Sequence, residues 1–178
     1  IITPSDYKKR FVFIGHIKKS KGVAEIIDAF NSLNNSYSVH LYGIIKDDVL
    51  NNLSLNNNIN YRGSLTPSEV IPTLRNYDVL ILPTYHAGEG YPGVIIEAYS
   101  QGLPVITTKW KQIPEIVVNN KTGFLITPKN KTELVNAIMK FTPQNYFRLS
   151  TNARSYFNNF NSELVNAKIL NELVKLKK

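Results

Sequence analysis

Short continuous apolar runs alternate with segments of helical periodicity along most of the chain, and this alternation limits the folds that it can adopt. Six runs are rich in Val, Ile, Leu and Phe: Phe11–Ile17, Val39–Tyr42, Ile59–Arg62, Val79–Pro83, Pro104–Thr107 and Phe124–Ile126. Apolar runs without polar alternation are typical of parallel strands that are covered on both faces. Repeated strand–helix units therefore predict an α/β fold with a doubly wound, mostly parallel sheet of six strands.

The segments between these runs carry helix signals. Apolar residues recur at helical spacing over Val23–Leu33, and the sequence TPSE at 66–69 combines a capping box with proline at the first helical position. Further helices are expected over Leu134–Phe141 and from about Gly93 to Gly102. Residues 143–178 show no strand pattern and predict two helices that pack on the domain.

Charge and composition restrict the class of partner. The 178 residues suit one domain, carry a net charge of +8 and include no cysteine, which excludes disulfides and thiolate metal sites. The loop lysines suit a phosphorylated small molecule, an anionic membrane surface or nucleic acid, with a merely solvated surface as the plain alternative. Nucleic acid is disfavoured because neither a helix-turn-helix pattern nor an RNA-binding aromatic pattern is present.

No signal of export or membrane insertion is visible in the sequence. No apolar run approaches the roughly 20 residues that span a bilayer, and no signal-peptide pattern opens the chain. Absence of cysteine is compatible with the cytoplasm. We therefore expect a cytoplasmic protein, with peripheral contact at the inner face of an anionic membrane as a further candidate interaction.

The strongest candidate site is the segment Gly88–Ile106, GEGYPGVIIEAYSQGLPVI. Glu89 and Glu97 bracket a compact turn and are separated by seven residues. The open N–H groups of Gly93–Ile95 at a helix N-terminus would form an anion site. Carboxylates beside such a site accept hydrogen bonds from hydroxyls, so the pair suits a sugar nucleotide. The plain alternative makes Glu97 a residue that compensates the helix dipole and Glu89 a surface acid.

A second candidate is the turn Gly15–Gly22 after the first expected strand. It lies at the carboxyl end of a strand, where ligands bind in such sheets. It is neither a GxGxxG fingerprint nor a P-loop, but Lys21 is placed to reach a diphosphate as a point charge. A structural turn with solvated lysines is the alternative. His16, His40 and His86 have no ligand-like spacing, so no metal site is expected.

Together these residues resemble the retaining glycosyltransferases of the GT-B fold, glycosyltransferase group 1 (family 4). The resemblance rests on the Glu-x7-Glu pair followed by Ala and by Gly-x-Pro-Val within Glu89–Ile106. It also rests on IPEIV at Ile113–Val117 and NKTGFL at Asn120–Leu125. The glycine–lysine turn Gly15–Gly22 matches more loosely, and the similarity extends from about residue 11 to residue 141.

The resemblance implies one half of a GT-B fold. Residues 11–142 would be a Rossmann-like donor-binding domain, after a linker remnant at 1–10 and before C-terminal helices at 143–178. An acceptor-binding N-terminal domain of the same chain would precede it, so this fragment alone is expected to be inactive. The implied reaction, in polysaccharide biosynthesis, transfers a sugar from a nucleotide-diphosphate sugar with retention and needs no metal or cofactor. A non-catalytic sugar-nucleotide binding module and an epimerase-like GT-B enzyme are the alternatives.

The family's functional residues can be carried over to matching positions. The resemblance implies that Lys21 contacts the donor diphosphate and that Glu89 holds hydroxyls of the transferred sugar, which makes these two the catalytic pair. Glu97 would hold the ribose hydroxyls, and the backbone of Leu65 would bind the base. The full donor-binding set is Gly15, His16, Lys21, Leu65, Glu89, Gly90, Tyr91, Pro92, Gly93, Val94 and Glu97.

Two positions depart from the family pattern. His16 stands where the family has arginine, so the diphosphate clamp is expected to be weaker or to be completed by Lys18 or Lys19. Pro92 stands where the family has glycine, which keeps the turn compact but removes one N–H donor.

Overall fold

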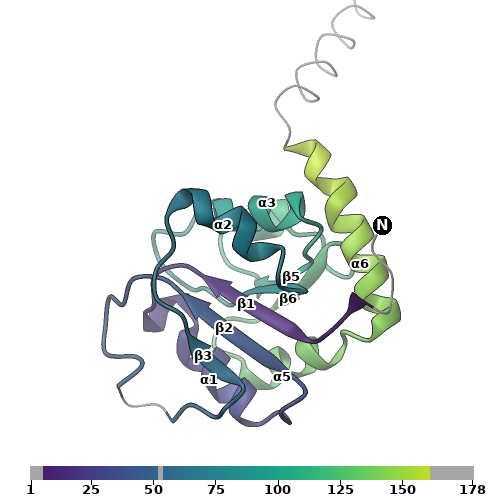
Figure 1. Cartoon of the computed structure of the whole chain (residues 1–178). Helices are drawn as coiled ribbons and strands as arrows, with labels where there is room; N and C mark the ends of the chain where they lie inside the picture. The colour runs from purple at the N-terminus through teal and green to yellow at the C-terminus, as the bar shows by residue number, and fades with distance from the viewer. Residues whose placement is uncertain (1–5, 52–53, 161–178) are drawn as a thin grey trace, which may run out of the picture.

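Six parallel strands form a single sheet in the computed structural model, which describes residues 6–51 and 54–160 (Figure 1). The strands are β1 (Arg10–Ile14), β2 (Ser38–Tyr42), β3 (Ile59–Tyr61), β4 (Val79–Leu82), β5 (Val105–Thr108) and β6 (Gly123–Ile126). Their order is β3-β2-β1-β4-β5-β6, and every neighbouring pair is parallel. The predicted six-stranded, doubly wound sheet is confirmed.

Helices cover both faces of the sheet (Figure 1). On one face, α1 (Val23–Asn31) packs against α5 (Lys131–Met139). On the other face, α3 (Gly93–Ser100) packs against α2 (Pro67–Leu74) and α6 (Pro143–Tyr156). The short elements are α4 (Ile113–Ile116) and the 3-10 turns η2 (Lys19–Lys21) and η3 (Phe157–Asn159). This double cover buries all four residues of the central strand β4.

The amino end of the sheet is closed by a buried carboxylate. Asp78 is 1% exposed and accepts hydrogen bonds from the backbone N–H groups of Lys8 and Arg10, at 2.9 and 2.8 Å. The Arg10 guanidinium pairs with the same carboxylate at 2.7 Å. A buried charge of this kind is tolerated only when paired and hydrogen-bonded. The carboxyl end of the sheet carries the longer loops, and ligands of open α/β sheets bind at that end.

Two predictions at the start of the chain need correction. The first strand was expected to reach Ile17, but it ends at Ile14, because the chain leaves the sheet at Gly15 and only Ile17 returns, in an isolated bridge to Ile45. The sequence also assigns residues 1–10 to a linker, yet Tyr7 is buried and stacks on Tyr146, with ring centroids 5.0 Å apart. Burial of this aromatic ring makes residues 7–10 part of the packed structure.

Helix limits follow local caps. The capping box at Thr66 is confirmed, since the Glu69 carboxylate accepts the Thr66 N–H at 2.7 Å. α5 begins at Lys131, earlier than predicted, because Asn130 caps it by accepting the Glu133 N–H at 3.0 Å. The first predicted C-terminal helix is α6, and the second lies outside the described residues.

Gly22 offers a stability test, because it lies where the loop after β1 touches Pro83, the residue that follows β4. Its φ is +77°, and a Cβ there would lie 2.3 Å from the Pro83 carbonyl oxygen. Gly22→Ala should therefore lower the free energy of unfolding by about 1–2 kcal/mol for the left-handed backbone plus about 1–3 kcal/mol for overpacking. Gly63→Ala is the matched control, since Gly63 has φ +81° and nothing within 4 Å. Equal losses in urea unfolding would contradict the close contact.

Candidate functional site

Two loops meet at the carboxyl end of the sheet, where the strand order reverses. The first loop follows β1 (residues 15–22), and the second loop follows β4 (residues 83–92). β1 and β4 are neighbours, but the helices that follow them, α1 and α3, lie on opposite faces. Ligands of open α/β sheets bind in the crevice that such diverging loops create. The backbone N–H of Tyr85 in the second loop donates to the Ser20 carbonyl in the first, at 2.9 Å. The two segments that the sequence analysis singled out therefore lie side by side.

Lys21 and Glu89 form an ion pair across these two loops. Nζ of Lys21 lies 2.5 Å from Oε2 of Glu89, and the two side chains are 14% and 9% exposed. The Thr84 hydroxyl donates a second hydrogen bond to the same carboxylate oxygen, at 2.7 Å. A pair so well shielded is screened little by salt. The structure thus brings the predicted catalytic pair into direct contact.

A cavity of about 360 Å³ opens beside Lys21, at the ends of β1 and β2. Four members of the predicted donor-binding set line it, namely Gly15, His16, Lys21 and Leu65. The rest of its wall was missed by sequence reasoning and consists of Ile14, Tyr42, Gly43, Ile44, Ser64 and Val70. Of these residues, Tyr42 and Gly43 could have been found from the sequence, because they lie at the carboxyl end of an apolar strand, as Gly15 does.

The other predicted donor-binding residues lie along the second loop and the first turn of α3, outside the wall of this cavity. They are Gly90, Tyr91, Pro92, Gly93 and Val94. Pro92 is the N-cap of α3, and its carbonyl accepts the Ile95 N–H at 3.0 Å. The expectation of an open N–H at Ile95 is therefore wrong, and only Gly93 and Val94 precede the first intrahelical bond. Tyr91 is exposed, and its hydroxyl donates to Glu115 of α4.

Glu97 lies on the second turn of α3 and is partly buried. Burial raises the pKa of its carboxyl group above the ordinary value. No ion pair within residues 6–51 and 54–160 engages it, and it does not line the cavity. The carboxylate is therefore available to a ligand, and its role as a ribose contact stays a prediction.

His16 is exposed at the cavity wall, at the position where the resemblance places an arginine. Desolvation lowers the pKa of its imidazole, and the positive charges of three neighbours lower it further: Lys46, Lys18 and Lys21. The ring is therefore neutral at pH 7. Unlike arginine, it adds no charge to the wall of the cavity in the free protein.

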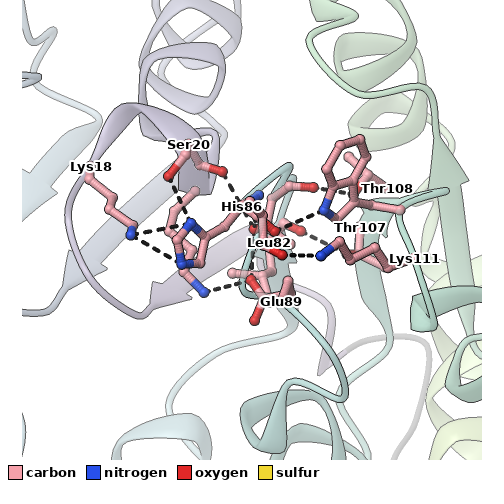
Figure 2. Close-up of polar contacts among 12 residues, drawn as sticks. Lys18, Ser20, Leu82, His86, Glu89, Thr107, Thr108 and Lys111 are labelled. Atoms are coloured by element: carbon pink, nitrogen blue, oxygen red, sulfur yellow. Dashed lines mark hydrogen bonds and ion pairs between the residues drawn. The ribbon is translucent and has the colours of Figure 1, made fainter.

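The second loop is held from both sides (Figure 2). On one side, Nζ of Lys18 lies 3.3 Å from both ring nitrogens of His86, and the Ser20 hydroxyl lies 3.4 Å from Nδ1. On the other side, Nε1 of Trp110 donates to the His86 carbonyl at 2.9 Å, and Nζ of Lys111 donates to the Ala87 carbonyl. Partial burial lowers the pKa of His86, and nearby lysines, Lys18 first, lower it further, so the ring accepts from Lys18.

The two lysines expected to complete the clamp differ in placement. Nζ of Lys19 pairs with Asp48 at 2.9 Å on the exposed surface, and its backbone N–H donates to Asp47 at 2.8 Å. Lys18 reaches instead toward His86 in the second loop (Figure 2). Of the two, Lys18 is the better placed to meet an anion near Lys21.

The part of the chain that the structure describes offers neither a metal site nor a membrane span. It contains no group of three or more His, Asp or Glu side chains that could hold a metal ion. None of its helices combines the length and the apolar character that a bilayer crossing requires.

Comparison with known proteins identifies the family. The model of the family "Glycosyl transferases group 1" matches residues 2–157. A curated relative is the capsular polysaccharide biosynthesis glycosyltransferase CapM of Staphylococcus aureus, 29% identical over 163 residues that cover 86% of this chain and 42% of CapM. The chain therefore spans less than half the length of that relative.

Two solved structures share the fold. Anabaena Alr3699/HepE in complex with UDP-glucose superposes with a TM-score of 0.78 and 22% identity, over 94% of this chain and 49% of that protein. The C-terminal domain of a glycosyl transferase group 1 family protein (LpcC) from Francisella tularensis gives a TM-score of 0.71 and 21% identity, over 85% of each chain. By its family match over residues 2–157, this chain belongs to the group 1 glycosyltransferases.

Proposed function

We propose that this chain is the donor-binding domain of an enzyme that transfers a sugar from a nucleotide-diphosphate sugar to an acceptor, with retention at the anomeric carbon. The observation that carries the proposal is the shielded Lys21–Glu89 pair at the switch point of the sheet, beside a cavity of about 360 Å³. A cation and a carboxylate held together there suit a diphosphate and the hydroxyls of its attached sugar.

Each part of the donor has a candidate partner in this proposal. The base enters the cavity beside the backbone of Leu65, and the ribose lies outside the cavity, where Glu97 accepts its hydroxyls. The diphosphate lies against Lys21 and the open N–H groups of Gly93 and Val94. The transferred sugar lies at Glu89.

The proposed chemistry is electrostatic. Lys21 stabilises the charge that develops on the departing diphosphate, and the N–H groups at the start of α3 add to this stabilisation. Glu89 orients the sugar for transfer. The proposal invokes neither a metal nor a cofactor, and Lys21 and the N–H groups at the start of α3 offset part of the negative charge of the diphosphate.

Other parts of the enzyme are proposed by the same argument. Since the chain spans 42% of CapM, we place the acceptor site on an N-terminal domain, so that residues 11–142 bind the donor weakly alone and transfer nothing. Residues 143–178 would form the C-terminal helices of that domain. The enzyme would work in the cytoplasm, and the net charge of +8 on this chain suits the anionic inner face of a membrane.

A panel of nucleotide sugars tests the proposal. UDP-glucose is the first candidate because HepE binds it, and GDP-mannose and ADP-glucose provide other bases. At least one should raise the midpoint of thermal unfolding of the chain, because a ligand that binds only the folded state stabilises it. Lys21→Ala should lose most of the shift. Absence of any shift across the panel at millimolar concentrations would contradict the proposed function.

The pH dependence of binding should report on His16. UDP-glucose should bind more tightly as the pH falls from about 7.5 to about 5.5, because a diphosphate beside the ring raises its depressed pKa. The complex then holds more protons than the free protein, so acid favours the complex. His16→Arg should bind as tightly as wild type or more tightly at pH 7.5 and should lose this dependence. Calorimetry that finds the same dependence in both proteins would place the diphosphate elsewhere.

A further inference from the structure

Thr84 is a buried hydroxyl that directly touches the Glu89 carboxylate. It follows β4, is 0% exposed, and donates its hydroxyl proton to Oε2 of Glu89 at 2.7 Å. The same hydroxyl oxygen accepts the backbone N–H of His86 at 3.2 Å. The Ser20 carbonyl oxygen lies farther from the hydroxyl, at 3.5 Å, so the proton points to the carboxylate at 2.7 Å. One donated and one accepted bond fix this orientation.

The backbone that carries this hydroxyl is itself fixed. The Thr84 N–H donates to the Leu82 carbonyl at 2.8 Å, and the Thr84 carbonyl accepts the hydroxyl of Thr108 on the neighbouring strand. Thr84 therefore belongs to the rigid end of the sheet, whereas Glu89 belongs to a loop. The bond between them holds the Glu89 carboxylate in a fixed position relative to the sheet.

The two oxygens of Glu89 are used differently. Oε2 receives both Lys21, at 2.5 Å, and Thr84, at 2.7 Å. Within the part of the chain that the structure describes, no residue bonds to Oε1. A carboxylate held through one oxygen presents the other at a defined place and angle.

We propose that Thr84 is a positioning residue for donor recognition: its hydroxyl anchors Oε2 of Glu89 so that Oε1 accepts a hydroxyl of the transferred sugar. This inference rests on the proposed function, in which Glu89 holds that sugar. Thr84 is fully buried and does not touch the donor. Lys21 shares the same oxygen, but a bound diphosphate competes for its positive charge. Thr84 is then the anchor that remains on Glu89 in the complex.

Calorimetric titration of the chain with UDP-glucose and with UDP, which lacks the sugar, separates positioning from a structural role. Thr84→Val keeps the shape and removes the hydroxyl, so UDP-glucose should bind at least about fivefold more weakly while UDP changes by less than about twofold. Thr84→Ser restores the hydroxyl and should bind both ligands nearly as wild type does. If Thr84→Val does not fold, Thr84→Ala provides the same comparison.

Two controls make the test specific. Thr107→Val removes another fully buried hydroxyl, which donates to the Leu82 carbonyl at 2.7 Å, and should leave both affinities unchanged. In a Glu89→Gln background, Thr84→Val should change UDP-glucose affinity by less than about twofold, because the two residues act as one unit.

The outcomes separate the role of Thr84 from the proposed function. Three results would overturn the role of Thr84 and leave the proposed function intact. They are a wild-type affinity of Thr84→Val for UDP-glucose, equal losses of affinity for both ligands, and an undiminished effect of Thr84→Val in the Glu89→Gln background. If the wild-type chain binds another nucleotide sugar of the panel in place of UDP-glucose, the same comparison is made with that donor and its nucleoside diphosphate. Failure of the wild-type chain to bind any nucleotide sugar of the panel would overturn the proposed function, and the role of Thr84 with it.

Discussion

Lys21→Ala is expected to weaken the binding of UDP by about 1–3 kcal/mol, roughly tenfold to a hundredfold, which is the range for hydrogen bonds to charged groups. The substitution removes the cation that lies closest to the cavity and to Glu89. It also leaves a carboxylate that is 9% exposed with Thr84 as its remaining partner. The loss should appear in the calorimetric dissociation constant, with thermal unfolding recorded to confirm that the variant is folded.

Lys19→Ala is the matched control. Lys19 lies two residues away in the same turn, but its ammonium pairs with Asp48 on the exposed surface. Its removal should leave UDP binding within experimental error, because exposed ion pairs contribute little and this one lies away from the cavity. If Lys21→Ala leaves the dissociation constant unchanged, or if Lys19→Ala weakens binding equally, the diphosphate is held elsewhere.

Glu89→Gln is expected to leave UDP binding intact and to lower turnover of the complete two-domain enzyme by roughly a hundredfold, the scale for loss of one preorganised polar contact. In the proposed donor pose its carboxylate meets the sugar, which UDP lacks. Glu97→Gln should act in the opposite way and weaken UDP itself by about 1 kcal/mol or more, because a neutral amide replaces a charged acceptor at the ribose.

The two glutamate variants control for each other, since they make the same chemical change on either side of the start of α3. Equal losses against UDP would show that the separate assignments are wrong and that the pair has a structural role. Robust transfer by the 178-residue chain alone would also contradict the account, because half of the donor's surroundings and the acceptor site are proposed to lie on another domain.

The fold was predictable because its main signal is local. Residues of β4 are apolar at every position, and burial on both faces is what such a run requires. The helix at Pro67 was marked by a capping box that the structure reproduces. Strand ends were harder to predict, because the departure of β1 from the sheet at Gly15 depends on the neighbouring loop, in which Ile45 takes up the contact with Ile17.

The candidate site could be predicted from the sequence only where the type of residue itself indicated the chemistry. Lys21 and Glu89 stood out as charges in loops at strand ends, but nothing in the sequence indicated that they touch each other. Thr84 was missed because a single threonine after an apolar run resembles any other strand residue. Its importance arises from its distance to Glu89, and that distance is set by the path of a loop.

The most direct test of the account is chemical-shift mapping of isotope-labelled chain titrated with UDP. The account predicts that the backbone amide signals of Gly15, Lys21, Leu65 and Gly93 shift together and saturate at one dissociation constant. These residues surround the switch point at the carboxyl end of the sheet. Shifts confined to the amino end around Asp78, or an absence of shifts with UDP, GDP and ADP alike at millimolar concentrations, would contradict the claim that the carboxyl end of the sheet binds a nucleotide-sugar donor.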